Sequence, residues 1–255
     1  MQENLKSVLE YLETVPVIEP SGSALESALE NFASPEFNLE RQAVAIGSQI
    51  TEFSNNVPAD LRPHIANSLL LAQLAASKSI EKGGATSDWY KKYTEVLAKI
   101  GWLVEGDLNT EHEIEGTGSQ VHKAIMPVIT TALGGAAAAS LIIPLLKGLE
   151  NMNQGNPWLT LFDRESKRAS ANQFQICHVS SENGTAPKLV IVCFGLDASK
   201  SVTQVLFFKF SNTSGTLTHS QTELSIQPAI LNGSKDAIQA KVATHLSSFI
   251  SDIEI

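Results

Sequence analysis

The sequence predicts an α+β protein in which an N-terminal helical bundle is followed by a small antiparallel sheet and a C-terminal helix. Three observations predict this class. Apolar residues recur at helical spacing up to about residue 150, alternating and β-branched runs dominate from about residue 157, and helical spacing returns after residue 234. We therefore expect two intimately packed parts, a bundle over residues 1–155 and about four strands with their helix over residues 156–255.

Five helices are expected before residue 106. Residues 5–12 show apolar positions at i, i+3, i+4 and i+7, and prolines follow them. Shorter helical patterns cover residues 25–32 and 44–53. Two wider apolar faces, over residues 60–74 and 87–102, predict the helices that form most of the bundle.

The most informative stretch is residues 124–146, which are 23 consecutive uncharged residues between Lys123 and Lys147. As one helix the stretch would be about 34 Å long, enough for the ~30 Å hydrocarbon core of a bilayer. Gly134 and Gly135 predict a break that would leave halves too short to cross. The plain interpretation is a central helix buried on all sides by the bundle. The alternatives are a helix stored for release into a membrane, or a constitutive span.

Four strands are expected after the bundle, over residues 174–179, 189–194, 202–210 and 217–226. Their short connections favour an antiparallel meander. Residues 189–194 are apolar at every position, which places them at the centre of the sheet with both faces covered. Ser234 is expected to begin the final helix, whose apolar face packs on the sheet.

Composition narrows the functional classes. The chain has 255 residues, 43% of them hydrophobic, and a net charge of -9, so it is neither disordered nor basic. Residues 1–123 hold 18 acidic and 9 basic residues, whereas residues 124–255 hold 9 of each. Because a negative surface repels phosphate backbones, we expect no nucleic-acid partner.

The N-terminal residues and the cysteines bear on the cellular compartment of the protein. Residues 1–12 mix charged and apolar positions and show no Sec-type signal pattern. Cys177 and Cys193 lie in strand-like runs, which excludes a disulfide framework. We expect a soluble protein that is cytoplasmic at synthesis and whose release would not use a Sec signal peptide.

Enzyme and metal signatures are absent from the sequence. No Gly-x-Ser-x-Gly occurs, and Cys177 and His178 are neighbours on a strand, where side chains point to opposite faces. The acidic connector near residue 110 departs from a calcium loop at His112 and Gly118. We expect a non-enzymatic protein without cofactor or metal. Cys193 is expected to be inert core, with a thiol that contacts a lipid chain as the alternative.

Three groups of residues are candidates for a membrane function. Glu111, Glu113 and Glu115, with His112 and His122, form a candidate pH gate beside the uncharged stretch, because acid would remove their negative charge. Trp89, Tyr90 and Trp102 are candidate interfacial anchors. The inserting or lipid-contacting element, with the two glycines as its hinge, comprises Ile125, Val128, Ile129, Leu133, Gly134, Gly135, Leu141, Ile142 and Ile143.

A bundle that hides one long uncharged segment after an acidic connector resembles, in outline, α-helical pore-forming bacterial toxins and colicin-like domains. The resemblance covers roughly residues 1–150 and includes no diagnostic motif. It implies a toxin or virulence factor that acts on membrane lipid, with oligomers on the membrane. The alternative is a module for a fatty ligand or a protein partner in which the apolar helix stays permanently in the core.

Overall fold

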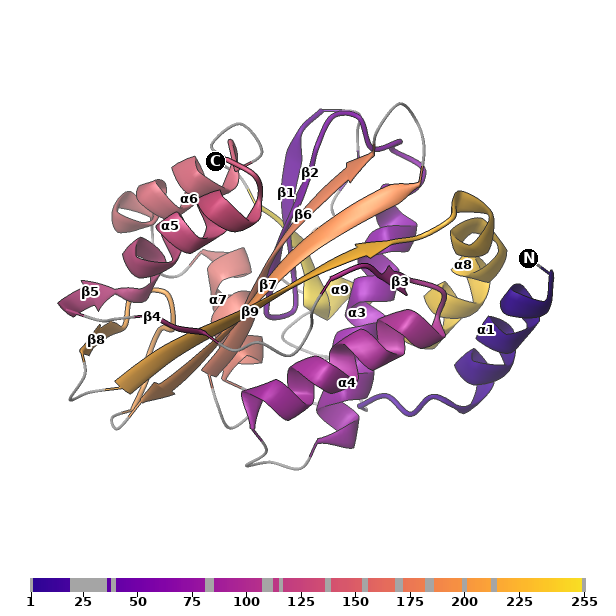
Figure 1. The fold of residues 1–255 in the computed structure, drawn as a ribbon, viewed down its shortest axis with the longest axis horizontal. Coiled ribbons are helices and arrows are strands. Elements are labelled where there is room, and N and C mark those ends of the chain that lie inside the picture. Colours follow the sequence, from indigo (N-terminus) through magenta and orange to yellow (C-terminus); the bar gives the residue numbers. More distant parts are fainter. Residues whose placement is uncertain are drawn as a thin grey trace.

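A computed structural model shows three layers, with helices on both faces of one mixed sheet (Figure 1). The central layer holds eight strands, and its two faces carry separate hydrophobic cores. The structure describes residues 2–18, 36–37, 40–80, 85–106, 112–114, 117–135, 139–152, 156–167, 172–181, 186–198, 201–211 and 215–253.

The sheet has the order β10-β1-β2-β6-β7-β9-β3, and β4 also pairs with β9. The β2–β6 pair is parallel, and the other pairs are antiparallel. A separate two-stranded sheet joins β5 (Thr117–Gln120) to β8 (Lys209–Ser211). The main strands are β1 (Gln42–Ile46), β2 (Gln49–Phe53), β3 (Leu103–Val104), β4 (His112–Ile114), β6 (Asn172–Ser181), β7 (Pro187–Ala198), β9 (Gly215–Ser225) and β10 (Ile250–Asp252).

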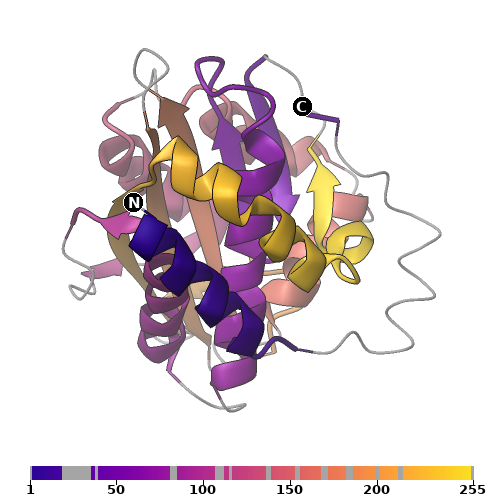
Figure 2. The same cartoon turned by 90° about the vertical axis from the view of Figure 1, so that its right-hand side faces the viewer.

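Four helices cover one face of the sheet. They are α3 (Arg62–Ser79), α4 (Thr86–Lys99), α8 (Pro228–Val242) and α1 (Gln2–Thr14). α1 and α8 lie side by side at the outside, in front of α3 (Figure 2). Thirteen of the 18 residues of α3 are buried, because it lies between the sheet and the outer helices.

Three helices cover the opposite face, namely α5 (Val121–Ala132), α6 (Ile142–Gly148) and α7 (Pro157–Ser166). A 3-10 turn (Leu149–Asn151) follows α6, and α9 (Leu246–Phe249) leads into β10. α5, α6 and α7 pack on the strand side chains that point away from α3. On β7, for example, Ile191 faces the α3 side, whereas Val192 and Phe194 face the α7 side.

The expected α+β class is confirmed, but the bundle layout and the four-strand sheet are wrong. The segment 44–53, expected as a helix, is the β1–β2 hairpin. Its apolar residues alternate between the two cores, and Gly47 turns the chain with a φ of 55°. The sheet therefore takes strands from both sides of residue 155.

Two expectations for the C-terminal part also need correction. The expected strand over residues 202–210 is mostly irregular, with only β8 at its end. The last long helix begins at Pro228 rather than Ser234, because Pro228 fits the first turn and Ser234 bonds back to Ile230 O at 2.9 Å inside the helix. The strand 189–194 lies in the interior of the sheet as expected, within β7 between β6 and β9.

Candidate functional site

The uncharged stretch 124–146 forms two short helices instead of one. α5 ends at Ala132, Gly134 and Gly135 take φ values of 81° and 117°, and α6 begins at Ile142. The Gly135 N–H donates to Thr130 O at 2.8 Å and closes the last turn of α5. We call residues 121–148 the apolar hairpin. The role of the two glycines as a hinge stays a prediction.

The inner side of the apolar hairpin is part of the core. Its buried side chains recur three or four residues apart on each helix and meet aromatic residues of β6 and β7, including Phe174 and Phe194. These inner side chains are Ile125, Ile129, Leu133, Ile142, Leu145 and Leu146, each at most 7% exposed. The helices therefore lie on the face of a sheet, and the expectation of a helix surrounded by other helices is wrong.

The outer side of the apolar hairpin carries no charge over residues 124–146. Surface helices ordinarily carry charged residues opposite the core. Here the outward positions are uncharged. The apolar ones are half-buried or exposed, namely Ala124, Met126, Pro127, Val128, Leu141, Ile143 and Pro144, and Thr130, Thr131 and Ser140 add hydroxyl groups. The exposed Lys123 and Lys147 bound them. No described helix is both long and apolar enough to cross a membrane.

An irregular segment, residues 201–208, holds the start of α5 against α7. His122 is 1% exposed, and its backbone N–H donates to Leu206 O at 2.9 Å, while its Nδ1 lies 2.9 Å from the same oxygen. On the other side, the Val205 N–H donates to Asp163 Oδ1 at 2.9 Å. The first turn of the apolar hairpin is therefore tied to α7 through this segment.

Asp163 is the most perturbed carboxyl group near the hairpin. It is 5% exposed, and burial raises its pKa from 3.8 to about 6, although the Val205 N–H and Lys167 favour the charged form. Asp163 was not singled out from the sequence. Its spacing from Leu159 and Phe162, on the buried side of α7, was the available signal.

The candidate pH gate is only partly visible. Glu111 and Glu115 lie outside the described residues. His112 and Glu113 are exposed on β4, and the His112 ring lies 5.4 Å from the ring of its cross-strand partner His219. Burial and the neighbouring His112 lower the pKa of His219. The structure thus pairs His112 with a histidine that the sequence did not single out, and it places His122 at the start of α5.

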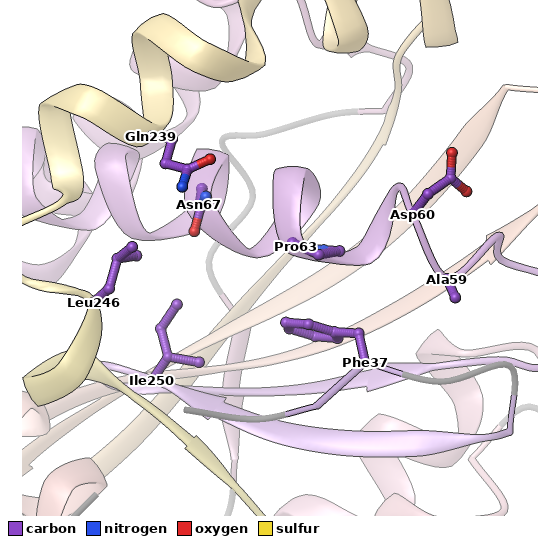
Figure 3. A pocket seen from close by; sticks show the side chains of 8 residues that line it. All are labelled: Phe37, Ala59, Asp60, Pro63, Asn67, Gln239, Leu246 and Ile250. Carbon is purple, nitrogen blue, oxygen red and sulfur yellow. The ribbon is translucent and has the colours of Figure 1, made fainter. Parts of the chain in front are cut away.

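The described part of the structure contains two cavities of about 480 Å³ each, one beside the His112–His219 pair and one beside α3. One is polar and lies against β9, with both histidines of the pair and the carboxylates of Glu105 and Glu223 in its wall. The other, between α3, α8 and β10, is lined by apolar side chains, two amides and Asp60 (Figure 3). Within the described ranges, no group of three or more His, Cys, Asp or Glu residues could hold a metal ion.

The candidate interfacial aromatics are core residues. Trp89, Tyr90 and Trp102 are at most 3% exposed and belong to the core on the α3 side, across the sheet from the apolar hairpin. The Trp102 indole donates to Ser68 Oγ at 3.3 Å, so its polar atom is satisfied internally. Reaching a membrane would require this layer to leave the sheet.

The candidate lipid-pocket thiol, Cys193, is also internal. It is 3% exposed in the core on the α3 side, where Gln175 Nε2 lies 3.9 Å from its sulfur, and it is not in the described wall of either cavity. Neither cysteine forms a disulfide, and both are buried. Burial raises the pKa of Cys177, which keeps that thiol protonated.

Comparison with known proteins gives distant structural similarities, including a delta-endotoxin and a virulence factor. No family model and no curated protein sequence matches the chain. A solved delta-endotoxin shares 11% identity at a TM-score of 0.42, over 84% of this chain and 91% of that one. The solved Evf virulence factor shares 12% identity at a TM-score of 0.32, over 97% and 91%. Both TM-scores are too low to establish a shared fold.

Proposed function

We propose that this chain is a membrane-active protein, of the toxin or virulence-factor kind, that contacts lipid through the outer side of its apolar hairpin. The observation that carries the proposal is the absence of charge on the outward positions of residues 124–146, which form the surface of one layer. A half-buried apolar surface without charge is suited to a binding or membrane-contacting face.

The lengths of the two helices favour contact at the membrane interface over spanning. α5 has 12 residues and α6 has 7, which correspond to about 18 Å and 10 Å at 1.5 Å per residue. Neither length approaches the ~30 Å hydrocarbon core. An apolar helix face that enters the headgroup region to about 5–10 Å requires no such length. Insertion as one helix would require Gly134 and Gly135 to become helical, a second step that acid could promote.

The test is co-sedimentation with vesicles that contain one third phosphatidylserine, and dye release from the same vesicles, at pH 7.5 and pH 5. Val128→Glu and Ile143→Glu each place a charge on the outer side, where a half-buried side chain can reach water. We expect each to reduce vesicle binding at least about tenfold. Leu103→Glu is the matched control, because Leu103 is 59% exposed on β3 at the sheet edge, outside the hairpin.

The alternative is a binding module in which the apolar hairpin never leaves the sheet. The burial of Ile125, Ile129 and Leu146 on the inner side favours it. If the native protein neither binds vesicles nor releases dye at either pH, the membrane function is wrong and the binding module replaces it. Equal loss of binding in Leu103→Glu and the hairpin variants would also contradict the assignment of lipid contact to this segment.

A further inference from the structure

We propose a zinc-binding site at the edge of the sheet, formed by the imidazoles of His112 on β4 and His219 on β9. β4 lies along β9 (Figure 1), and His112 pairs directly with His219 in the antiparallel register. No metal was expected from the sequence, because the two histidines come from distant parts of the chain and show no ligand spacing. The inference is independent of the proposed membrane function, since it uses no residue of the apolar hairpin.

The register brings the two rings onto one side of the sheet. Residues directly opposite each other in an antiparallel pair point to the same face and have their Cβ atoms about 4.5–5.5 Å apart. The ring centres of His112 and His219 are 5.4 Å apart, and the His219 ring also lies 6.2 Å from the ring of Phe194. The pair therefore lies beside the hydrophobic core to which Phe194 belongs, with His112 exposed to solvent.

The separation of the rings suits tetrahedral coordination. A Zn–N bond is about 2.0–2.1 Å long, which puts each ring centre about 3.2 Å from the ion. Two imidazoles at the tetrahedral angle would then have ring centres about 5.2 Å apart, whereas adjacent ligands of a square plane would have them about 4.5 Å apart. The observed 5.4 Å lies close to the tetrahedral value. Zinc is the divalent ion that prefers this geometry with nitrogen ligands.

His219 has a ring nitrogen available for a metal ion. Its Nδ1 atom is buried and has no hydrogen-bond partner among the residues that the structure describes. Buried polar atoms ordinarily have a partner, and a metal ion at this nitrogen would supply the missing contact. Burial and the neighbouring His112 also lower the pKa of His219, which keeps its imidazole neutral at pH 7. The neutral ring is the form that binds metal ions.

The surroundings of the pair leave room for the remaining ligands. The polar cavity of about 480 Å³ beside it can hold the water molecules that would complete four-coordination. Glu105 and Glu223 give the cavity wall a negative charge, which favours a cation over an anion. Glu223 lies four residues beyond His219 on β9, about 13 Å along the strand, so it does not bind the same ion. Two histidines and water thus form an open site that links β4 to β9.

The test is calorimetric titration of the intact protein with zinc chloride at pH 7.5, after treatment with EDTA and dialysis. We expect one ion per chain, and a dissociation constant at least about tenfold higher in His112→Gln and in His219→Gln, because each variant loses one of two protein ligands. His64→Gln is the matched control. His64 is half-buried on α3, on the other face of the sheet, and burial lowers its pKa as well. This variant should bind zinc like the native protein.

A stability measurement separates zinc binding from folding. Zinc should raise the unfolding temperature of the native protein by mass action and leave that of His112→Gln unchanged. Because His112 is exposed, this variant should fold like the native protein even if His219→Gln does not. Magnesium, which prefers oxygen ligands, should change neither unfolding temperature. The proposal is overturned if no saturable zinc binding occurs below about 1 mM, or if His112→Gln binds zinc as tightly as the native protein.

Discussion

Replacing Asp163 by asparagine tests how the start of the apolar hairpin is anchored. The asparagine side chain has nearly the same shape and keeps an oxygen that can accept the Val205 N–H. The change therefore removes the charge and preserves the hydrogen bond. What it alters is the free energy of keeping an ionised carboxyl group 5% exposed within α7.

The magnitude follows from the pKa of Asp163, which burial raises from 3.8 to about 6. Because the folded protein binds this proton more tightly than the unfolded chain, the charged form destabilises the fold above pH 6. Stability is regained as the pH falls from about 6 toward 4. At 1.36 kcal/mol for each pH unit, the penalty at pH 7.5 is about 3 kcal/mol at most, and we expect about 1–3 kcal/mol after local relaxation.

Urea unfolding at pH 7.5 and pH 5 measures the effect. Asp163→Asn should stabilise the protein by about 1–3 kcal/mol at pH 7.5. The gain should be about half as large at pH 5, where the folded carboxyl group is mostly protonated but that of the unfolded chain is still ionised. Asp197→Asn, at an exposed position of β7, is the control. An Asp163→Asn variant that is no more stable than the native protein at pH 7.5 would refute the reasoning. If the reasoning holds, acid stabilises the contact between Asp163 and residues 201–208. Any release of the apolar hairpin by acid must then depend on other groups.

Three further predictions use other contacts. The pKa of His219 is lowered in the folded protein, so its contribution to stability is complete above about pH 6.5 and is lost as the pH falls. The unfolding temperature of His219→Gln should therefore decrease less between pH 7 and pH 5 than that of the native protein. Gly47→Ala should cost about 1–3 kcal/mol in urea unfolding, since φ is 55° and the new Cβ would lie 2.5 Å from Gln73 Oε1; an unchanged midpoint would contradict this. Tyr93→Phe should cost about 1–2 kcal/mol by the same measurement, because it leaves Gln49 Oε1 without its 2.9 Å donor.

Sequence periodicity identified long elements and missed short ones. The helical pattern over residues 60–74 lies within α3, and the apolar run 189–194 lies within β7. The helical pattern is long enough for its spacing to be unambiguous, whereas the run 189–194 was identified from its β-branched residues and the turn residues around it. The hairpin 42–53 was not identified, because its strands are buried on both faces and a short apolar run has no distinctive period.

The candidate site shows the same division. The absence of charge over residues 124–146 and the glycine break are properties of the chain itself, because charge and backbone freedom belong to each residue wherever it lies. The surroundings of the buried Asp163 include Val205, which lies 42 residues further along the chain and donates its N–H to the carboxylate. No local pattern reports such neighbours.

The sequence by itself determined the mixed helix and strand content, the negative charge and the uncharged segment with its break. Only the tertiary structure decided that this segment lies on a sheet with one apolar side outward, and that strands from both parts of the chain share that sheet. The physical reason is that periodicity shows which side of an element is apolar, whereas the partner that covers this side is chosen by long-range packing.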